Sequence, residues 1–173
     1  LVLVGSPRPG GPTEQLIEEL AIGDVVQVVS GLSDGELAAL VGSAEIACVP
    51  SLYEGFSLPT VEAMACGTPL VASRAGAIPE VVGDDDRAAW LVAPGDAGEL
   101  AHALSDLLAD PDRRARMGRH GRDRAVERFS WPAVARATAT AYRRAIAAAG
   151  PGGDAGPAGD AGSTGVGSDD GDT

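Results

Sequence analysis

The sequence predicts an α/β protein with a Rossmann-like parallel sheet flanked by helices. Short aliphatic runs alternate with helix-length segments as far as residue 92, and the first of these runs, LVLVG, is apolar until its final glycine. Such runs are typical of strands buried on both faces, and strands that alternate with helices form parallel sheets. Beyond residue 95 only helical patterns follow, so we expect the sheet to end there.

The same patterns place each element along the chain. Strands are expected at residues 1–5, 25–29, 45–50, 69–73 and 88–92. Helices are expected at 13–21, after Ser33, and at 59–66, 96–109, 112–129 and 131–148. Thr13 and Ser33 are candidate N-caps, and Glu36 follows Ser33 at the spacing of a capping box. The segment 74–86 is expected to be a loop whose three consecutive aspartates form a polar turn.

Charge and composition exclude several classes of function. The formal net charge is −12, which argues against a general nucleic-acid surface. All 13 basic residues are arginine, so mechanisms that need a lysine, such as Schiff-base chemistry or a P-loop, are excluded. No apolar run reaches the roughly 18 residues of a membrane span, and no signal peptide is visible, which favours a cytoplasmic protein.

The chain divides into a folded part and a tail. Residues 1–148 carry the periodic patterns, whereas residues 149–173 are rich in Gly, Asp, Pro and Ala without periodicity. Such a composition cannot offset the entropy of ordering, so we expect a disordered tail. The chain starts without Met inside a strand-like run, which leads us to expect a fragment truncated at its N-terminus.

The stretch YEGFSLPTVEAMACG, residues 53–67, carries the candidate binding site. Gly55 is expected to allow a tight turn, and Pro59 suits the first position of a helix. Unpaired amides at a helix start, where the helix dipole is positive, suit a phosphate group. Four amides are expected in that position, those of Gly55, Phe56, Ser57 and Leu58.

Two acids flank these amides. Glu54 precedes the turn, and Glu62 lies one helical turn inside the helix. Because Glu62 has apolar neighbours on nearly every side, we expect a buried carboxylate that needs a hydrogen-bond partner. Two interpretations remain open. Either both acids bracket a phosphate-containing ligand, or Glu62 only stabilises the helix dipole and Glu54 is a solvated loop acid.

The segment PSLYEGFSLPTVEAMACGTPLVAS closely resembles the signature of family 4 (group 1) retaining glycosyltransferases, which have the GT-B fold. The matching features are a Glu, seven residues, a second Glu, an alanine-rich turn and Gly-Thr-Pro before a strand. Further matches, AGAIPEVVGDD, AAWLVAPGDAGELAHAL and RFSWPAVA, extend the resemblance over residues 1–148. It implies that these residues form the nucleotide-sugar-binding, C-terminal half of such an enzyme.

Carried over residue by residue, the resemblance implies three roles. Glu54 matches the catalytic-site acid that contacts the transferred sugar, and Glu62 matches the acid that binds the nucleotide ribose. The turn that meets the diphosphate comprises Gly55, Phe56, Ser57 and Leu58. The resemblance also implies that no metal and no separate cofactor take part. Gly76 is a departure, since the family often has two glycines where this chain has one.

The resemblance also implies partners that this sequence lacks. In the family, an earlier strand and loop supply an Arg and a Lys for the diphosphate, and an N-terminal domain binds the acceptor. We therefore expect an inactive fragment of an enzyme that transfers a sugar from a nucleotide sugar to an acceptor with retention. Two alternatives remain: a non-catalytic nucleotide-binding or scaffold module, and a GT-B nucleotide-sugar epimerase relative. The absence of His near residues 50–80 weighs against the epimerase.

Seven arginines fall within residues 113–128, and two interpretations of them stay open. The acids between them favour an ordinary solvated helix, whereas a basic stripe would suit peripheral contact with the inner membrane face. Phe129 and Trp131, at the end of this segment, are expected to anchor the last helix against the sheet.

Overall fold

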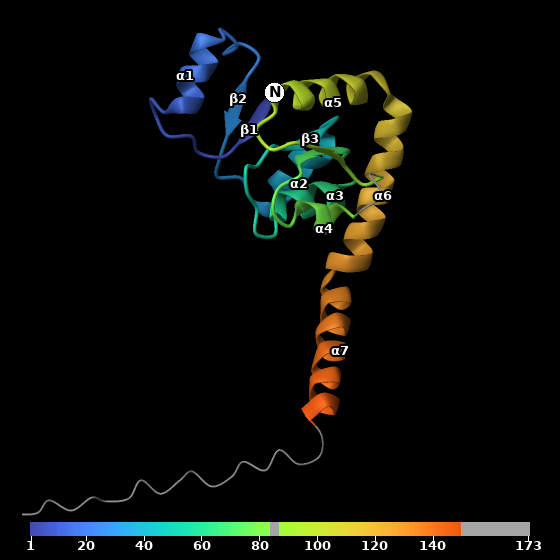
Figure 1. Ribbon diagram of the computed structural model, residues 1–173. Coiled ribbons are helices and arrows are strands. Elements are labelled where there is room, and N and C mark those ends of the chain that lie inside the picture. The colour runs from blue at the N-terminus through green and yellow to red at the C-terminus, as the bar shows by residue number, and fades with distance from the viewer. Residues whose placement is uncertain (84–86, 150–173) are drawn as a thin grey trace, which may run out of the picture. The chain divides into compact units, whose positions relative to one another are not determined.

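Five short strands and seven helices make up the described part of the chain (Figure 1). The structure is a computed structural model, and it describes residues 1–83 and 87–149. The strands are β1 (Val2–Val4), β2 (Gln27–Val29), β3 (Ala47–Val49), β4 (Leu70–Ser73) and β5 (Trp90–Val92). The helices are α1 (Pro12–Glu19), α2 (Asp34–Ser43), α3 (Leu58–Cys66), α4 (Ile78–Val82), α5 (Ala97–Ala109), α6 (Pro111–Phe129) and α7 (Trp131–Ala149). The predicted order is confirmed, except that α4 lies where a loop was expected.

All strand pairs are parallel, which confirms the predicted α/β class, but the strands form two sheets. β1 pairs with β2, whereas β3, β4 and β5 form a second sheet in that order. Every residue of β4 is buried, as expected of a central strand. In β1, by contrast, Val2 and Val4 are exposed, so the expected burial of residues 1–5 on both faces is wrong. The reason is that β1 has one strand partner, and the following helix α1 buries none of its residues.

Helices cover the three-stranded sheet on both faces and so build the core. Along β4, Leu70 belongs to one buried cluster with α3 and α4, and Val71 belongs to a second cluster with α5. This division follows from the alternation of side chains along a strand. Helix α6 reaches both clusters, through Ala125 and Met117. The core therefore holds helix α3 in place, because its Met64 side chain is fully buried there.

Two helix starts test the predicted caps. The capping box at α2 is confirmed, because the Ser33 hydroxyl accepts from Glu36 N and the Glu36 carboxylate accepts from Ser33 N at 2.8 Å. At α1 the predicted cap Thr13 is wrong, since Gly11 occupies the N-cap position and Pro12 follows it inside the helix. Proline suits the first helical turn because its missing N–H has no intrahelical acceptor there.

Replacing Ser33 with alanine is expected to raise the pKa of Glu36. Hydrogen bonds from the Ser33 hydroxyl and the Ser33 amide hold this pKa below its ordinary value. A carboxyl group whose pKa is lowered on folding stabilises the folded state at neutral pH, and this contribution is lost as the pH falls through the folded pKa. The loss of melting temperature on replacement should therefore be larger at neutral pH than in acid, where only the neutral cap bond from Glu36 N to the Ser33 hydroxyl is lost.

An NMR titration of Glu36, together with thermal melts at several pH values, measures both effects. Ser105→Ala is the control, because the Ser105 hydroxyl bonds only to a carbonyl within its own exposed helix face. A Glu36 pKa that does not move in Ser33→Ala would contradict the prediction.

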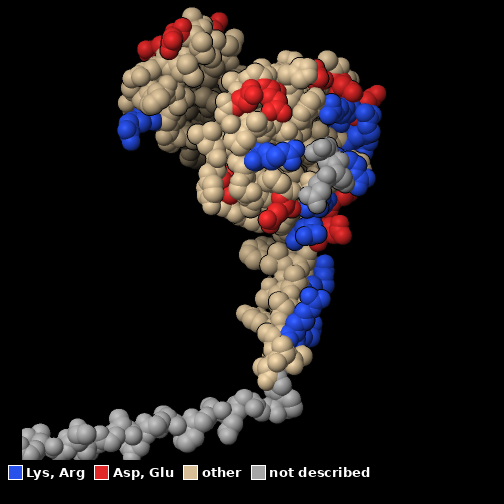
Figure 2. Space-filling view, in the orientation of Figure 1, with Lys and Arg blue, Asp and Glu red and all other residues tan. Residues whose placement is uncertain are grey.

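Arginines of α6 cap three other helices, which accounts for part of the basic stripe. Arg114 donates to two carbonyls in the last turn of α5, Arg122 to one near the end of α3, and Arg124 to two at the end of α4. The Arg113 guanidinium lies 3.9 Å from the centroid of the Trp90 ring. Figure 2 shows arginine side chains along the α6 side of the molecule, with acidic side chains among them. These four arginines are therefore structural rather than simply solvated.

Three arginines of α6 remain without a partner among the described residues: Arg116, Arg119 and Arg128. The membrane interpretation thus stays a prediction for these three. None of the described helices is both long enough and apolar enough to cross a bilayer. The second part of α7, residues 135–149, is a separate unit whose side chains are nearly all exposed. The predicted aspartate turn at 84–86 and the predicted disordered tail from 150 onward lie outside the described residues.

Candidate functional site at the start of helix α3

Ser57 takes a left-handed backbone conformation at the start of α3. Its φ is 67° and its ψ is 74°, a region that non-glycine residues rarely occupy. Gly55, which was expected to supply the turn, has no positive φ. The buried Ser57 hydroxyl lies 2.8 Å from the buried Thr60 Oγ1, so it does not cap the helix. Local strain of this kind accumulates at binding sites.

Helix α3 therefore begins without a side-chain cap. The amides of Gly55, Phe56, Ser57 and Leu58 have no hydrogen-bond acceptor among the described residues. A helix start carries a partial positive charge, and its first N–H groups have no intrahelical acceptor. The four predicted residues thus offer donors that suit an anionic oxygen group.

Glu54 is held by two neighbouring segments. Its Oε1 accepts a hydrogen bond of 2.8 Å from the Ser51 hydroxyl, and its main-chain oxygen accepts one of 3.1 Å from Ala77 N. Gly76 lies against the same main-chain oxygen so closely that a β-carbon at this position would overlap it. The half-buried Glu54 is therefore positioned by the turn between β4 and α4, which the sequence did not connect with it.

Glu62 lies on the exposed face of α3, so the expectation of a buried carboxylate is wrong. The helix buries Thr60, Ala63 and Met64, whose spacing defines one face, and Glu62 lies outside that face. Among the described residues the Glu62 carboxylate has no hydrogen bond and no ion pair. Glu62 therefore needs no ligand in order to be tolerated, but its oxygens are available to accept hydrogen bonds from one.

Phe56 attaches the loop to the end of α6. Its ring packs edge-to-face on Phe129, with centroids 5.7 Å apart and an interplanar angle of 77°. Such pairs contribute about 0.5–1.5 kcal/mol beyond the buried area. Phe129 also packs against the buried cluster of α3 and α4, as expected for an anchor. Trp131 is 87% exposed, so its predicted anchoring role is wrong.

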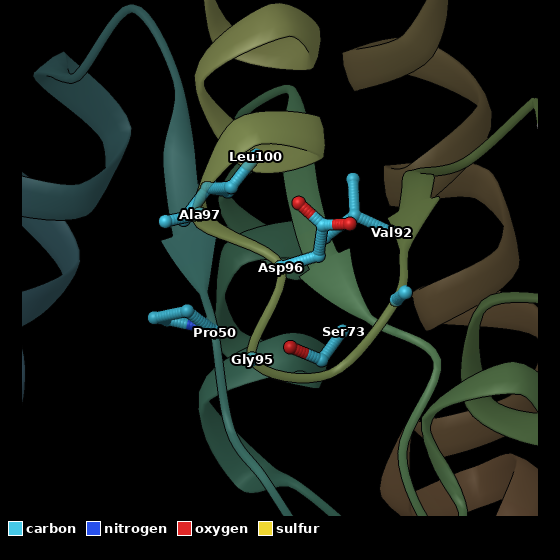
Figure 3. Close-up of a pocket in the computed structure, with 8 residues that line it drawn as sticks. Pro50, Ser73, Val92, Gly95, Asp96, Ala97 and Leu100 are labelled. Carbon is cyan, nitrogen blue, oxygen red and sulfur yellow. The ribbon is translucent and has the colours of Figure 1, made fainter.

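A hollow of about 200 Å³ opens at the carboxyl ends of β3, β4 and β5. Figure 3 shows Pro50 on one side of it, Val92 on the other and Ser73 between them. Asp96, also on its lining, caps α5 by accepting a hydrogen bond of 2.8 Å from Glu99 N. Sequence reasoning missed Ser73 and Asp96 as lining residues. Their positions at or just beyond strand ends are the signal that could have found them, since ligands bind there in such sheets.

The groups that the site brings together are N–H donors flanked by two carboxylates. No cluster of three or more His, Cys, Asp or Glu side chains in the described ranges is placed to hold a metal ion. Amides at a helix start bind anions, and carboxylates accept strong hydrogen bonds from hydroxyl groups. The arrangement is therefore suited to a ligand that carries both an anionic group and hydroxyls.

Comparison with known proteins decides the family. A family model described as "Glycosyl transferases group 1" matches residues 1–124, which include the entire loop and helix α3. The chain belongs to the group 1 glycosyltransferases. The parallel sheets flanked by helices accordingly form part of a GT-B fold, as the resemblance implied.

Two curated relatives of this group 1 chain are longer than the chain itself. The MMP alpha-(1->4)-mannosyltransferase of Mycolicibacterium hassiacum is 61% identical over 147 residues, which are 85% of this chain and 36% of the mannosyltransferase. The D-inositol 3-phosphate glycosyltransferase 2 of Catenulispora acidiphila is 41% identical over 151 residues, which cover 84% of this chain and 35% of that glycosyltransferase. The chain thus spans about a third of the length of the curated relatives it matches.

Solved structures agree with this assignment. The sucrose-phosphate synthase of Thermosynechococcus elongatus has a TM-score of 0.75 and 37% identity, over 86% of this chain and 39% of that one. Anabaena Alr3699/HepE is 26% identical over 83% of this chain and 40% of its own. It was solved in complex with UDP and with UDP-glucose, with TM-scores of 0.74 and 0.72.

Proposed function

We propose that this chain is the donor-binding half of a retaining, family 4-type glycosyltransferase whose substrate is a nucleotide sugar. The uncapped start of α3, with free amides between Glu54 and Glu62, is the observation that carries the proposal. The complexes of HepE with UDP and UDP-glucose support it, since that protein shares this fold at 26% identity.

Each part of the site has a role in this proposal. The diphosphate accepts hydrogen bonds from the free amides, where the helix dipole also favours negative charge. The exposed Glu62 carboxylate accepts hydrogen bonds from the ribose hydroxyls. Glu54, oriented by the Ser51 hydroxyl and by the turn at Gly76, contacts the sugar that is transferred.

The reaction explains why this chain needs further residues to catalyse. Transfer breaks the bond between the anomeric carbon and the diphosphate oxygen and forms a bond from that carbon to an acceptor hydroxyl oxygen, whose proton is released as the nucleoside diphosphate leaves. The leaving diphosphate gains negative charge, which preorganised donors and cations stabilise. Amides alone supply only part of this stabilisation. We assign the remaining cations and the acceptor site to a domain outside this chain, in keeping with relatives more than twice as long.

Replacing Glu62 with alanine is expected to weaken nucleoside diphosphate binding about tenfold, because each hydrogen bond to a charged group contributes about 1.5–3 kcal/mol. Calorimetry at millimolar UDP, GDP or ADP in the presence of EDTA measures the loss, since we propose that binding needs no metal. Glu127→Ala, an exposed glutamate on α6, is the control and should bind as the parent does.

The same titrations separate this proposal from its rivals. Equal binding by the parent and by Glu62→Ala would remove Glu62 from the ribose role. No saturation-transfer NMR signal with any of the three nucleotides would indicate a scaffold that binds no nucleotide.

The purified chain alone is expected to show no sustained sugar transfer. Losing one electrostatic donor to the leaving group costs about 2.7–4 kcal/mol of barrier, and this chain would lack several. Release of nucleoside diphosphate from UDP-, GDP- and ADP-sugars, with mixed sugar acceptors, tests this. Multiple turnovers that disappear in Glu54→Gln would contradict the prediction, and the variant also excludes a contaminating enzyme.

A further inference from the structure

A second hollow, of about 110 Å³, lies along β5 between the end of β4 and the start of α6. Four residues line it: Arg74, Trp90, Leu91 and Arg113. Two of the four are arginines, in a chain whose net charge is −12. Two cations beside one hollow repel each other, so this arrangement suits a space that an anion fills.

The Arg113 guanidinium is held in position by an aromatic ring. It lies 3.9 Å from the centroid of Trp90, and Trp90 in turn packs edge-to-face with His102. Stacking of this kind fixes the plane of the guanidinium but leaves the N–H groups on its rim free. Within the described residues these N–H groups have no acceptor. Arg113 thus presents preoriented, unused donors.

Arg74 supplies the second cation from the end of β4. Its amide donates to Val92 O at 2.7 Å, which fixes its backbone against β5, and its side chain is exposed. The guanidinium of Arg74 also has no acceptor among the described residues. Since β5 is the last strand of its sheet and Val92 faces β4, the backbone groups of Leu91 point to the free edge. The hollow therefore combines two guanidinium groups with an unpaired strand edge.

We propose that Arg74 and Arg113 bind a phosphate group, either as free phosphate or as part of a small phosphomonoester. Guanidinium groups match phosphate oxygens with paired N–H donors. A water molecule takes about 30 Å³, so the hollow holds one tetrahedral anion but is far below the roughly 300 Å³ of a nucleotide-sized pocket. Asp110, an acid three residues before Arg113, does not line the hollow, and its Oδ1 accepts a hydrogen bond from Arg113 N as the cap of α6. None of these residues belongs to the proposed donor site.

Titration of the ¹⁵N-labelled chain with inorganic phosphate tests the proposal. The indole signal of Trp90 should shift saturably at millimolar phosphate, while that of the exposed Trp131 serves as an internal reference. Arg74→Gln and Arg113→Gln should each weaken binding about tenfold, as expected for loss of a charge-assisted pair. Arg116→Gln is the matched control and should bind as the parent does, because Arg116 is an exposed arginine of the same helix without a partner among the described residues.

Two further titrations complete the test. Glycerol 3-phosphate distinguishes the sources, because tighter binding than free phosphate indicates a phosphomonoester and equal binding indicates phosphate itself. Sodium chloride at matched ionic strength should not shift Trp90. Equal shifts with chloride, or phosphate shifts that persist unchanged in Arg74→Gln, would overturn the proposal. Arg74→Gln is decisive here because its side chain does not stack on the reporting ring.

Discussion

Nucleotide binding is expected to fall by about tenfold or more when Gly76 is replaced by alanine. Gly76 has a φ of +52°, and a β-carbon there would overlap the main-chain oxygen of Glu54. Because the overlapped atom is backbone, the turn and the Glu54 loop must separate, and the bond from Ala77 N to Glu54 O is lost. The amides that follow Glu54, which we assign to the diphosphate, are then displaced with the loop. Saturation-transfer NMR with a nucleoside diphosphate measures the binding, and faster amide exchange at Ala77 reports the lost bond.

Gly10→Ala is the matched control. Gly10 has a φ of +66° but no described atom within 4 Å of its β position, so alanine there brings the same backbone strain without the overlap. Each variant should lose about 1–2 kcal/mol of folding stability from the left-handed conformation. Only Gly76→Ala should also weaken nucleotide binding. Normal binding and normal Ala77 exchange in Gly76→Ala would show that the turn does not hold the loop that carries Glu54 and the four amides.

Alanine at Gly118 is expected to lower the free energy of unfolding by about 1–3 kcal/mol, although alanine usually favours a helix over glycine. Gly118 is buried in α6 where this helix contacts the end of α3, and a β-carbon would overlap the main-chain oxygen of Gly67. Gly67 is the left-handed C-cap of α3, with a φ of 74°, and its amide bonds back to the helix. The two helices must therefore move apart to make room.

Gly35→Ala is expected to change the free energy of unfolding in the opposite direction. Gly35 lies in the first turn of α2 and has no described atom within 4 Å of its β position. Alanine there should stabilise the chain by up to about 1 kcal/mol through helix propensity alone. Urea unfolding of both variants gives the two free energies. A stabilised Gly118→Ala would mean that α3 and α6 do not pack as closely as described.

The order of strands and helices could be predicted because it depends on local patterns. The buried strand at 70–73 and the capping box at Ser33 each depend on residues close together in the sequence, and both are confirmed. Helix α4 was missed because its five residues are too few to show a helical period. Its internal Pro79 and the pair Val81 and Val82 were read as part of a loop.

The site was predicted in its residues but not in its geometry. Helix α3 has apolar residues around most of its circumference, so periodicity could not show that Thr60 faces the core and Glu62 the solvent. The left-handed residue proved to be Ser57 and not Gly55, and a positive φ at a non-glycine residue is too rare to be expected from sequence. The contact of Gly76 with Glu54 is likewise non-local, and no sequence pattern indicates it.

The arginines of α6 have a consequence for how the folded chain opens. Arg114, Arg122 and Arg124 each satisfy terminal carbonyls of a different helix, so α5, α3 and α4 share one neighbour at their C-terminal ends. Detachment of α6 would unpair all three ends at once, and fraying of any one end is opposed by the same helix. We therefore expect transient unfolding of this region to be a single cooperative event, governed by the helix that carries most of the chain's positive charge.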